Sequence, residues 1–449
     1  MIKYKRCSIK IQAFHYRVEV TKVKQIYSKL FMMFLVVLIA TTSFMSQPMN
    51  TQAQELELDA ESAILVDAET GKVLYAKSPD IALPPASMTK MMTEYLVLEA
   101  IENGEITWET TTQISDYAYS ISANPEFSGI GLTQDKSYTV KELYEAMAIF
   151  SDNGTTIALA ELISGSEGEF VKRMNQKAEE MGLPDYQFVN STGLDNSSLG
   201  DNYPEGTDPN GTDLLSARSL ALLAYNLINE FPHALEISSR IEDDFEGYTV
   251  ENLNWMLPHE ASYLQQFYYE GIDGLKTGYT GLAGYTFTGT AERNGNRLIT
   301  VVMRTDSKEA RFEQTAKLMD YGFSQFEKKD LFAAGYQLEG KESIPVAKGK
   351  EDTVDISIKE GISLPVKSGD EELYSLEYSI DKDLLNEDGN LIAPIKKGDK
   401  IGTAKLVYTG ENDYGYIFNA DNLTVDIVAE KTVEKANWFM LTLGAIGDF

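Results

Sequence analysis

The sequence predicts an α/β (α+β) domain over residues 54–327, followed by a small all-β domain, a sandwich, over residues 328–430. In the first region, strand-like segments at both ends enclose a helical middle, which indicates one sheet built from distant parts of the chain and covered by helices. In the second region, short segments of alternating polarity are separated by Gly, Asp and Asn. A chain of 449 residues with 43% hydrophobic residues is long enough to bury such cores.

The first domain opens with a predicted β-hairpin. Apolar and polar residues alternate over Glu61–Lys77 on both sides of a Glu-Thr-Gly turn, which is the pattern of paired strands with one buried face. Pro84 and Pro85 then interrupt the chain, and apolar residues recur at helical spacing over Ser87–Glu102. Ser87 is therefore expected at the N-terminal end of a helix.

A middle stretch from Thr139 to Met181 is expected to be wholly helical, and the end of the domain returns to strands. Three middle segments have apolar residues at helical spacing: Thr139–Phe150, Thr156–Ile163 and Glu167–Met181. Three later segments have strand character: one around Lys276, then Gly284–Ala291 and Leu298–Met303, the last two joined by a turn at Arg293–Asn296. Ser307–Phe326 is expected to close the domain as a helix.

The end of the chain combines strands with an apolar tail. Five segments alternate as strands do: Ser343–Val346, Val354–Ile358, Tyr374–Ser379, Gly402–Tyr408 and Leu423–Val428. Residues 431–449 then carry two lysines followed by aromatic and aliphatic residues, over a length too short to span a bilayer. This composition predicts an amphipathic membrane-anchoring helix, with a tail folded onto the β-domain as the alternative.

The first 53 residues are predicted to be a secretory signal. A basic stretch precedes the apolar run Leu30–Ala40, which has the length of a signal peptide's hydrophobic core rather than of a spanning helix. Small residues at Thr51 and Ala53 suit a signal peptidase, so cleavage is expected after Ala53. An uncleaved N-terminal anchor is the alternative.

Charge and cysteine content exclude several classes of function. The chain has 39 Lys and Arg against 69 Asp and Glu, and loss of residues 1–53 removes eight basic residues and one acidic one, which brings the net charge from −30 to about −37. So acidic a protein would repel a phosphate backbone, and no nucleic-acid partner is expected. The one cysteine, Cys7, lies in the leader, which leaves no thiol for a disulfide, a zinc site or catalysis.

Three short strings carry the candidate chemistry: Ser87-Met88-Thr89-Lys90, Ser151-Asp152-Asn153 and Lys276-Thr277-Gly278. Each string alone is weak evidence, because ordinary residue usage produces such triplets and quartets by chance. All three in this order are expected by chance in about one chain in a hundred. Their joint occurrence favours a catalytic site.

A serine and a lysine three residues apart on a helix lie on the same face, so the Ser87 hydroxyl and the Lys90 amine can meet. A serine becomes a good nucleophile when a base removes its proton, and a buried amine can be that base if a nearby cation such as Lys276 helps to lower its pKa. The usual histidine base is absent, since His233 and His259 lie in no catalytic motif.

The other two strings supply the walls of the predicted site. Ser151 is expected to relay a proton to the leaving amine and Asn153 to hydrogen-bond the substrate backbone, while Asp152 holds the loop. Lys276 and Thr277 present a cation and a hydroxyl to a substrate carboxylate, and Gly278 leaves room for a peptide alongside. The backbone N–H groups of Ser87 and Tyr279 are candidates for an oxyanion hole.

These residues, together with the stretches PPASMTKMMTEYLVLEAI, FSDNGTTIALAELISGS and GIDGLKTG, resemble the serine D-Ala-D-Ala carboxypeptidases of the penicillin-binding protein 5 type, peptidase family S11. The resemblance covers nearly the whole chain. It implies a penicillin-binding or serine β-lactamase-like catalytic domain, an all-β domain and an amphipathic tail. It also implies a location on the outer face of the cytoplasmic membrane.

The resemblance implies removal of the terminal D-alanine from peptidoglycan stem peptides through an acyl-enzyme, covalent inhibition by β-lactams, and no metal or organic cofactor. By the same resemblance Ser87 is the acylated serine and Lys90 its base, while Ser151, Asn153, Lys276 and Thr277 line the pocket. Arg311 is a candidate ligand for the terminal carboxylate. Tyr279 stands where some relatives carry histidine, so the pH profile is expected to differ.

Three alternatives stay open at this point. A serine β-lactamase shares the three strings, but the sequence has no Glu-x-x-Leu-Asn string to activate a deacylating water. A DD-endopeptidase uses the same chemistry on cross-linked peptides. A non-catalytic wall-binding scaffold would keep the fold, although the intact Ser87, Lys90 and Lys276 argue against it.

Overall fold

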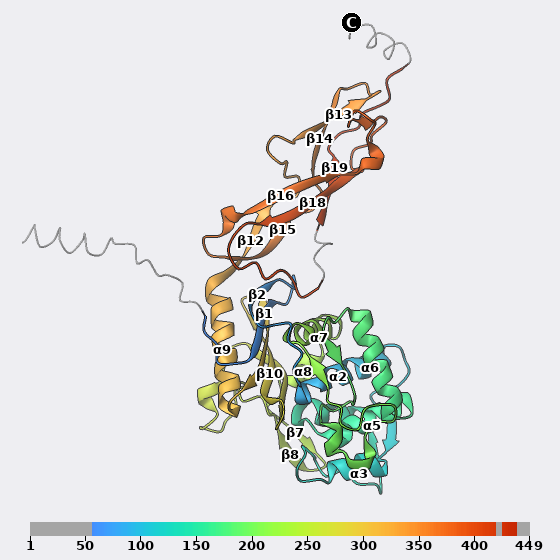
Figure 1. The fold of residues 1–449 in the computed structure, drawn as a ribbon, viewed down its shortest axis with the longest axis vertical. Helices are drawn as coiled ribbons and strands as arrows, with labels where there is room; N and C mark the ends of the chain where they lie inside the picture. Colours follow the sequence, from blue (N-terminus) through green and yellow to red (C-terminus); the bar gives the residue numbers. More distant parts are fainter. Residues whose placement is uncertain (1–55, 419–423, 438–449) are drawn as a thin grey trace, which may run out of the picture. The chain divides into compact units, whose positions relative to one another are not determined.

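The computed structural model describes residues 56–418 and 424–437. The predicted signal segment and the predicted signal peptidase site lie outside the described residues, as does most of the predicted C-terminal helix. Figure 1 shows the helix-rich first domain and the β-domain that follows it.

The first domain is built on a five-stranded antiparallel sheet with the strand order β2-β1-β11-β10-β9. Its strands are β1 (Ser62–Asp67), β2 (Val73–Lys77), β9 (Ile272–Thr280), β10 (Gly284–Arg293) and β11 (Asn296–Thr305). Because β1 pairs with β11, the first and last strands of the domain lie side by side. This confirms the prediction of one sheet formed by distant segments.

The sheet is covered by helices, as predicted. The helices are α2 (Lys90–Glu102), α3 (Asp116–Ser122), α4 (Val140–Glu145), α5 (Asn153–Ser164), α6 (Glu167–Met181), α7 (Ala217–Glu230), α8 (Ala234–Ser238) and α9 (Lys308–Gln325). Helix α9 packs through Phe312 and Met319 on one face, while α2 and α7 belong to the larger apolar core on the other (Figure 1). Ser307 caps α9, since its hydroxyl accepts the N–H of Ala310 at 3.0 Å.

The stretch predicted to be helical is helical from Val140 to Met181 apart from short connections, but the rest of the middle of the domain is not wholly helical. Three two-stranded ribbons interrupt the helices: β3 (Thr111–Gln113) with β4 (Ser137–Thr139), β5 (Tyr186–Gln187) with β6 (Leu214–Leu215), and β7 (Glu242–Phe245) with β8 (Tyr248–Glu251). Strands of two to four residues are too short to show a period in the sequence. The turn between β7 and β8 is Glu246-Gly247, both residues with positive φ, and it lacks the Asn-Gly or Asp-Gly signal that marks such hairpins.

The second domain is all-β, as predicted, with two sheets of unequal size. The smaller pairs β12 (Phe326–Phe332) with β15 (Ile362–Lys367). The larger has the order β16-β18-β19-β14-β13-β17, with bounds β13 (Ser343–Ala347), β14 (Thr353–Ile358), β16 (Tyr374–Ile380), β17 (Leu391–Ile392), β18 (Lys400–Tyr408) and β19 (Thr424–Ala429). Prediction missed β12, β15 and β17, because β12 is rich in charge, β15 contains Pro365 and β17 has two residues.

The predicted C-terminal helix does not begin at residue 431. Residues 431–437 are extended along the β-domain, where Val433 forms a bridge with Ile395 and the N–H of Lys350 donates to the carbonyl of Glu434. Val433 is fully buried in the β-domain core, so packing decides the conformation here. Residues 438–449 lie outside the described residues.

Candidate active site

The turn that carries Ser87 is formed by the two prolines and a short 3-10 helix, η1 (Ala86–Thr89), which runs directly into α2. Pro84 and Pro85 fix the backbone before the helix, so Ser87 lies at its start, as predicted. Ser87 is half-buried, whereas Lys90, one turn later, is fully buried. The distance between Lys90 Nζ and Ser87 Oγ is 2.9 Å.

The Lys90 amine has three polar neighbours. Besides Ser87 Oγ, these are Asn153 Oδ1 at 2.8 Å and the backbone carbonyl of Thr192 at 2.9 Å. The amide oxygen and the carbonyl can only accept hydrogen bonds, so they take both N–H groups of a neutral amine and leave its lone pair for the Ser87 hydroxyl. This is the arrangement that a general base requires.

Burial is the main reason why Lys90 can be neutral. It holds the pKa of Lys90 well below the usual value, and the nearby charge of Lys276 lowers that pKa further. The carboxylates of Asp152, Glu94 and Asp213 oppose this effect. Glu94, one turn further along α2, is itself buried, and burial raises its pKa to about 7.

The second string lies where the helix ending at Phe150 meets α5. Ser151 adopts a left-handed conformation with φ 68°, and its buried hydroxyl has no hydrogen-bond partner among the described residues. Asp152 holds the loop, as predicted, because its carboxylate accepts the N–H groups of Ile130 at 2.6 Å and Thr155 at 2.5 Å. Asn153 Oδ1 accepts a hydrogen bond from Lys90 Nζ, and the amide Nδ2 of Asn153 donates to the carbonyl of Ser128.

The third string lies on β9, next to the Ser87 turn. Lys276 is 2% exposed, and burial lowers its pKa to about 8, opposed by the charge of Glu94. Thr277 is also buried. Gly278 lines the cavity beside Ser87 and has a packing role that was not predicted, since a Cβ there would lie 2.6 Å from the carbonyl oxygen of Pro85. The glycine lets the strand approach the turn that carries the nucleophile.

Tyr279 and Arg311 complete the predicted set. Tyr279 is 55% exposed, and its ring stacks on that of Tyr285 with 4.3 Å between centroids. Arg311 is 3% exposed, its Nη1 donates to the carbonyl of Gly278 at 3.1 Å, and its buried Nε has no partner within residues 56–418 and 424–437. Burial lowers the pKa of Arg311 to about 10, so the guanidinium stays charged at neutral pH.

One cavity of about 350 Å³ joins these groups. Seven predicted residues line it: Ser87, Ser151, Asn153, Thr277, Gly278, Tyr279 and Arg311. Lys90 and Lys276 are not among the lining residues. Sequence reasoning missed eight further lining residues: Glu126, Phe127, Ser128, Leu194, Leu253, Trp255, Tyr285 and Lys308. No motif marks these residues, and they come from segments far apart in the chain.

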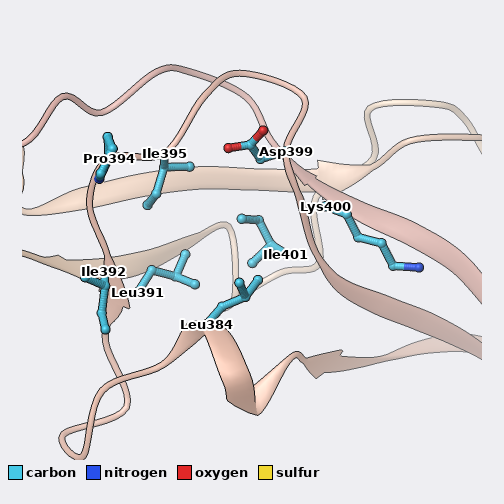
Figure 2. A pocket seen from close by; sticks show the side chains of 8 residues that line it. All are labelled: Leu384, Leu391, Ile392, Pro394, Ile395, Asp399, Lys400 and Ile401. Atoms are coloured by element: carbon cyan, nitrogen blue, oxygen red, sulfur yellow. The ribbon is translucent and has the colours of Figure 1, made fainter.

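A second cavity, of about 260 Å³, lies in the β-domain and has a different character (Figure 2). Figure 2 shows Leu391, Ile395 and Ile401 around it, with the Lys400 side chain directed away. Its one carboxylate, Asp399, already accepts the N–H of Lys396 at 2.8 Å. This cavity therefore lacks a nucleophile, and the cavity beside Ser87 is the candidate active site.

Neither of the two described histidines lines the Ser87 cavity. His259 lies 2.8 Å from the carbonyl of Asn254, and His233 packs against Trp108 and Phe231. No group of three or more His, Cys, Asp or Glu residues in the described part of the chain is arranged to hold a metal ion.

A serine hydroxyl beside a buried lysine, at the edge of an antiparallel sheet covered by helices, is typical of the serine acyl-transfer enzymes that use no histidine base. Comparison with known proteins agrees. The chain belongs to the D-alanyl-D-alanine carboxypeptidase family, peptidase S11, which it matches over residues 49–307. Residues 326–435 match the penicillin-binding protein 5 C-terminal domain. The family resemblance predicted from the three strings is confirmed.

Individual relatives extend this likeness over most of the chain. D-alanyl-D-alanine carboxypeptidase DacF of Bacillus subtilis (strain 168) is 34% identical over 86% of this chain and 91% of its own length. A crystal structure of a peptidoglycan synthesis regulatory factor (PBP3) from Streptococcus pneumoniae has a TM-score of 0.66 and 38% identity, and covers 84% of this chain and 99% of its own. Penicillin-binding protein D2 from Listeria monocytogenes, in a cefotaxime-bound form, has a TM-score of 0.51 and 33% identity, and covers 60% of this chain and 98% of its own.

Proposed function

We propose that this chain is a serine D-Ala-D-Ala carboxypeptidase that removes the terminal D-alanine from peptidoglycan stem peptides through an acyl-enzyme on Ser87, and that β-lactams acylate the same serine. Membership of the carboxypeptidase family supports this activity. The observation that carries the proposal is the polar environment of Lys90, where two obligate acceptors leave the amine lone pair for Ser87. The cefotaxime-bound Listeria relative supports the inhibitor class.

In the acylation step, Lys90 takes the proton of Ser87 as the Oγ forms a bond to the carbonyl carbon of the penultimate D-alanine. The carbonyl π electrons move onto its oxygen, for which the N–H groups of Ser87 and Tyr279 are the assigned donors. When the tetrahedral intermediate collapses, the carbon–nitrogen bond breaks and the electron pair leaves with the amine of the terminal D-alanine. Ser151 passes a proton from Lys90 to that amine, a role that suits its unpartnered hydroxyl in the cavity.

Water then hydrolyses the acyl-enzyme. Lys90, neutral again, takes a proton from the attacking water, and the ester bond to Ser87 breaks with return of a proton to Oγ. The product is a stem peptide shorter by one residue. Every proton in the cycle is held by Lys90, Ser151 or Ser87, so this sequence needs no further proton carrier from the chain.

The terminal carboxylate of the substrate is assigned to the cationic side of the cavity. Thr277 and Arg311 line that side, and Lys276 supplies a charge close behind it. Arg311 is anchored through Nη1 to the carbonyl of Gly278, while its buried Nε has no partner within the described ranges. A carboxypeptidase substrate ends in a free carboxylate beside the bond that is cut, whereas an internal peptide bond has none.

We also assign the protein to the outer face of the cytoplasmic membrane, tethered by residues 438–449. The family's activity on the cell wall and the tail's aromatic and aliphatic composition support this location. No helix in the part of the chain that the structure describes is long and apolar enough to cross a membrane. We expect the full chain to cosediment with anionic lipid vesicles and a chain ending at residue 437 not to do so. Equal sedimentation of the two chains would contradict the tether.

The activity is tested on the full chain, because a form ending at residue 430 would remove the buried Val433. The protein is incubated with a muropeptide ending in D-Ala-D-Ala, and free D-alanine is measured, with Ser87→Ala as the control. Release of D-alanine by the wild type alone supports the proposal. Cleavage of cross-linked dimers without release of D-alanine would indicate an endopeptidase. Rapid hydrolysis of free penicillin with repeated turnover would indicate a β-lactamase. Failure of a fluorescent penicillin to label Ser87 would indicate a scaffold.

A further inference from the structure

The carbonyl of Thr192, which takes one N–H group of Lys90, belongs to a buried turn that the three sequence strings do not include. The turn comprises residues 190–194, and Lys90 and Thr192 are 102 positions apart in the chain. Asn190, Ser191 and Thr192 are at most 1% exposed. A carbonyl in such a place needs a support that fixes its direction, because the peptide unit could otherwise rotate away from the amine.

Asn190 provides that support from inside the turn. Its Oδ1 accepts the N–H groups of Thr192 at 3.0 Å and Gly193 at 2.8 Å, and the hydroxyl of Thr192 at 2.8 Å. Its Nδ2 donates to the carbonyl of Leu194 at 2.6 Å and to Asn196 Oδ1 at 3.0 Å. One amide side chain therefore binds the N–H of the peptide group whose carbonyl faces Lys90, as well as backbone groups before and after it.

A second set of bonds ties this turn to the turn of the nucleophile. Asp213 accepts the backbone N–H groups of Val189 at 2.6 Å and Asn190 at 3.3 Å through one oxygen, and the hydroxyl of Thr89 at 2.8 Å through the other. Thr89 lies between Ser87 and Lys90. The two turns also touch directly, since a Cβ on Gly193 would lie 1.9 Å from the carbonyl oxygen of Ala86.

We propose that Asn190 is a positioning residue for acylation: it holds the Thr192 carbonyl against Lys90, and so directs the lone pair of the neutral amine at the Ser87 hydroxyl. The inference rests on the proposed function for the role of Lys90. Without the Thr192 carbonyl, Lys90 keeps Asn153 as its one obligate acceptor, and the second N–H group can turn toward Ser87 in place of the lone pair. The nucleophile would then lose its base while keeping its place.

The test is the second-order rate constant for acylation of the full chain by a fluorescent penicillin, measured from pH 5 to pH 10. Asn190→Ala is expected to lower the plateau rate about 10- to 100-fold, within the range of general-base contributions. The acid limb of the profile is expected to move to lower pH, because a carbonyl acceptor favours the charged amine and its loss lowers the pKa of Lys90. The charged groups that act on Lys90, namely Lys276, Asp152, Glu94 and Asp213, are unchanged in this variant.

Asn175 offers a matched control, because its side chain also bonds to three backbone groups, the carbonyls of Val171 and Phe188 and the N–H of Phe188. Asn175→Ala is expected to leave the acylation rate of the labelled fraction within about twofold of wild type. A second variant, Thr192→Val, keeps the carbonyl but removes the hydroxyl that donates to Asn190. It is expected to lower the rate about threefold, in the same direction as Asn190→Ala.

The final stoichiometry of labelling separates positioning from folding. A merely structural role of Asn190 would reduce the fraction of protein that can be labelled, while the rate constant and acid limb of the labelled fraction matched wild type. That result, or wild-type kinetics in both Asn190→Ala and Thr192→Val, would overturn the proposal. Failure of the wild type itself to react at Ser87 would instead refute the proposed function, so the two failures are distinguishable.

Discussion

Two lysines of this protein, Lys90 in the active site and Lys72 where the β-domain meets the first domain, are both buried but have different neighbours. Lys90 is 0% exposed and Lys72 is 9% exposed. Burial lowers the pKa of both, that of Lys72 to about 8. Lys72 Nζ donates to the carbonyl of Pro365 at 3.2 Å and to the hydroxyl of Tyr374, and it lies 4.7 Å and 5.7 Å from the ring centroids of Tyr374 and Tyr408.

The comparison shows that burial and a lowered pKa do not by themselves make a lysine a base. The aromatic faces around Lys72 attract a cation, whereas the acceptors around Lys90 accommodate a neutral amine with its lone pair at a serine hydroxyl. The space differs as well. The cavity beside Lys72 holds about 40 Å³, against about 350 Å³ beside Ser87, so only the latter can admit a peptide.

The surroundings of Lys72 also have a structural purpose, because a segment of the second domain docks beside it. The N–H of Val73 donates to the carbonyl of Gly415 at 2.9 Å, and the N–H of Ile417 donates to the carbonyl of Gly71 at 3.0 Å. Ile417 is 2% exposed and belongs to the apolar core of the first domain. Lys72 thus lies at the junction of the two domains, whereas Lys90 lies beside Ser87 at the candidate active site.

The largest expected effect separates the two lysines by activity. Lys90→Met is expected to lower the rate of acylation by a fluorescent penicillin on the order of 10³-fold, since a general base contributes 10²- to 10⁴-fold. Methionine keeps an unbranched chain but has no amine. Lys72→Met is expected to stay within about twofold of wild type. If both variants lost activity equally, the distinction drawn between the two sites would be wrong.

The next effect concerns stability at the junction. Ile417→Ala removes buried side-chain atoms from the first domain's core and is expected to lower the free energy of unfolding by about 2–4 kcal/mol in urea titrations of the full chain. The matched control is Ile392→Ala, which is 45% exposed and is expected to change that free energy by no more than about 0.5 kcal/mol. Equal midpoints for the two variants would show that the segment around residue 417 does not support the first domain.

Lys72 should also appear in the pH dependence of stability. Because folding lowers its pKa from 10.5 to about 8, the unfolded chain binds more protons between these values, and this lysine makes stability rise with pH across that window. The rise is at most about 1.4 kcal/mol per pH unit for one group. Lys72→Met is expected to lack this contribution while keeping those of Lys90 and Lys276. The contribution is measured as the difference in free energy of unfolding between variant and wild type from pH 7 to 10. A difference that stays constant with pH would contradict the lowered pKa of Lys72.

The smallest expected effect is a shift in a pH profile. The charge of Lys276 lowers the pKa of Lys90, so Lys276→Gln is expected to raise that pKa and to move the acid limb of acylation to higher pH. Lys276→Arg keeps the charge and is expected to leave the limb in place. In the wild type, KM for a D-Ala-D-Ala peptide is expected to rise above about pH 8, where Lys276 loses its proton. If the acid limb stayed at the wild-type pH in both variants, the charge of Lys276 would not affect the pKa of Lys90.

Local patterns predicted much of the fold. The hairpin of β1 and β2, the helix after Pro85, α6 at Glu167–Met181 and the capped α9 were all predicted within a few residues, because each is set by contacts between near neighbours in the chain. The sequence did not predict the short ribbons, because their strands are too short to show a period. The extended conformation of residues 431–437 depends on the burial of Val433. Periodicity carries no information about such distant partners.

The sequence by itself determined the candidate reacting groups: residue type and spacing single out Ser87, Lys90 and the two further strings. Tertiary structure decided how these groups are held. The Thr192 carbonyl reaches Lys90 from 102 positions away, Gly278 is required by Pro85, and Arg311 is fixed by Gly278. The physical reason is range: a helical turn brings residues three or four apart together in any fold, whereas a hydrogen bond between distant segments exists only after the whole chain has packed.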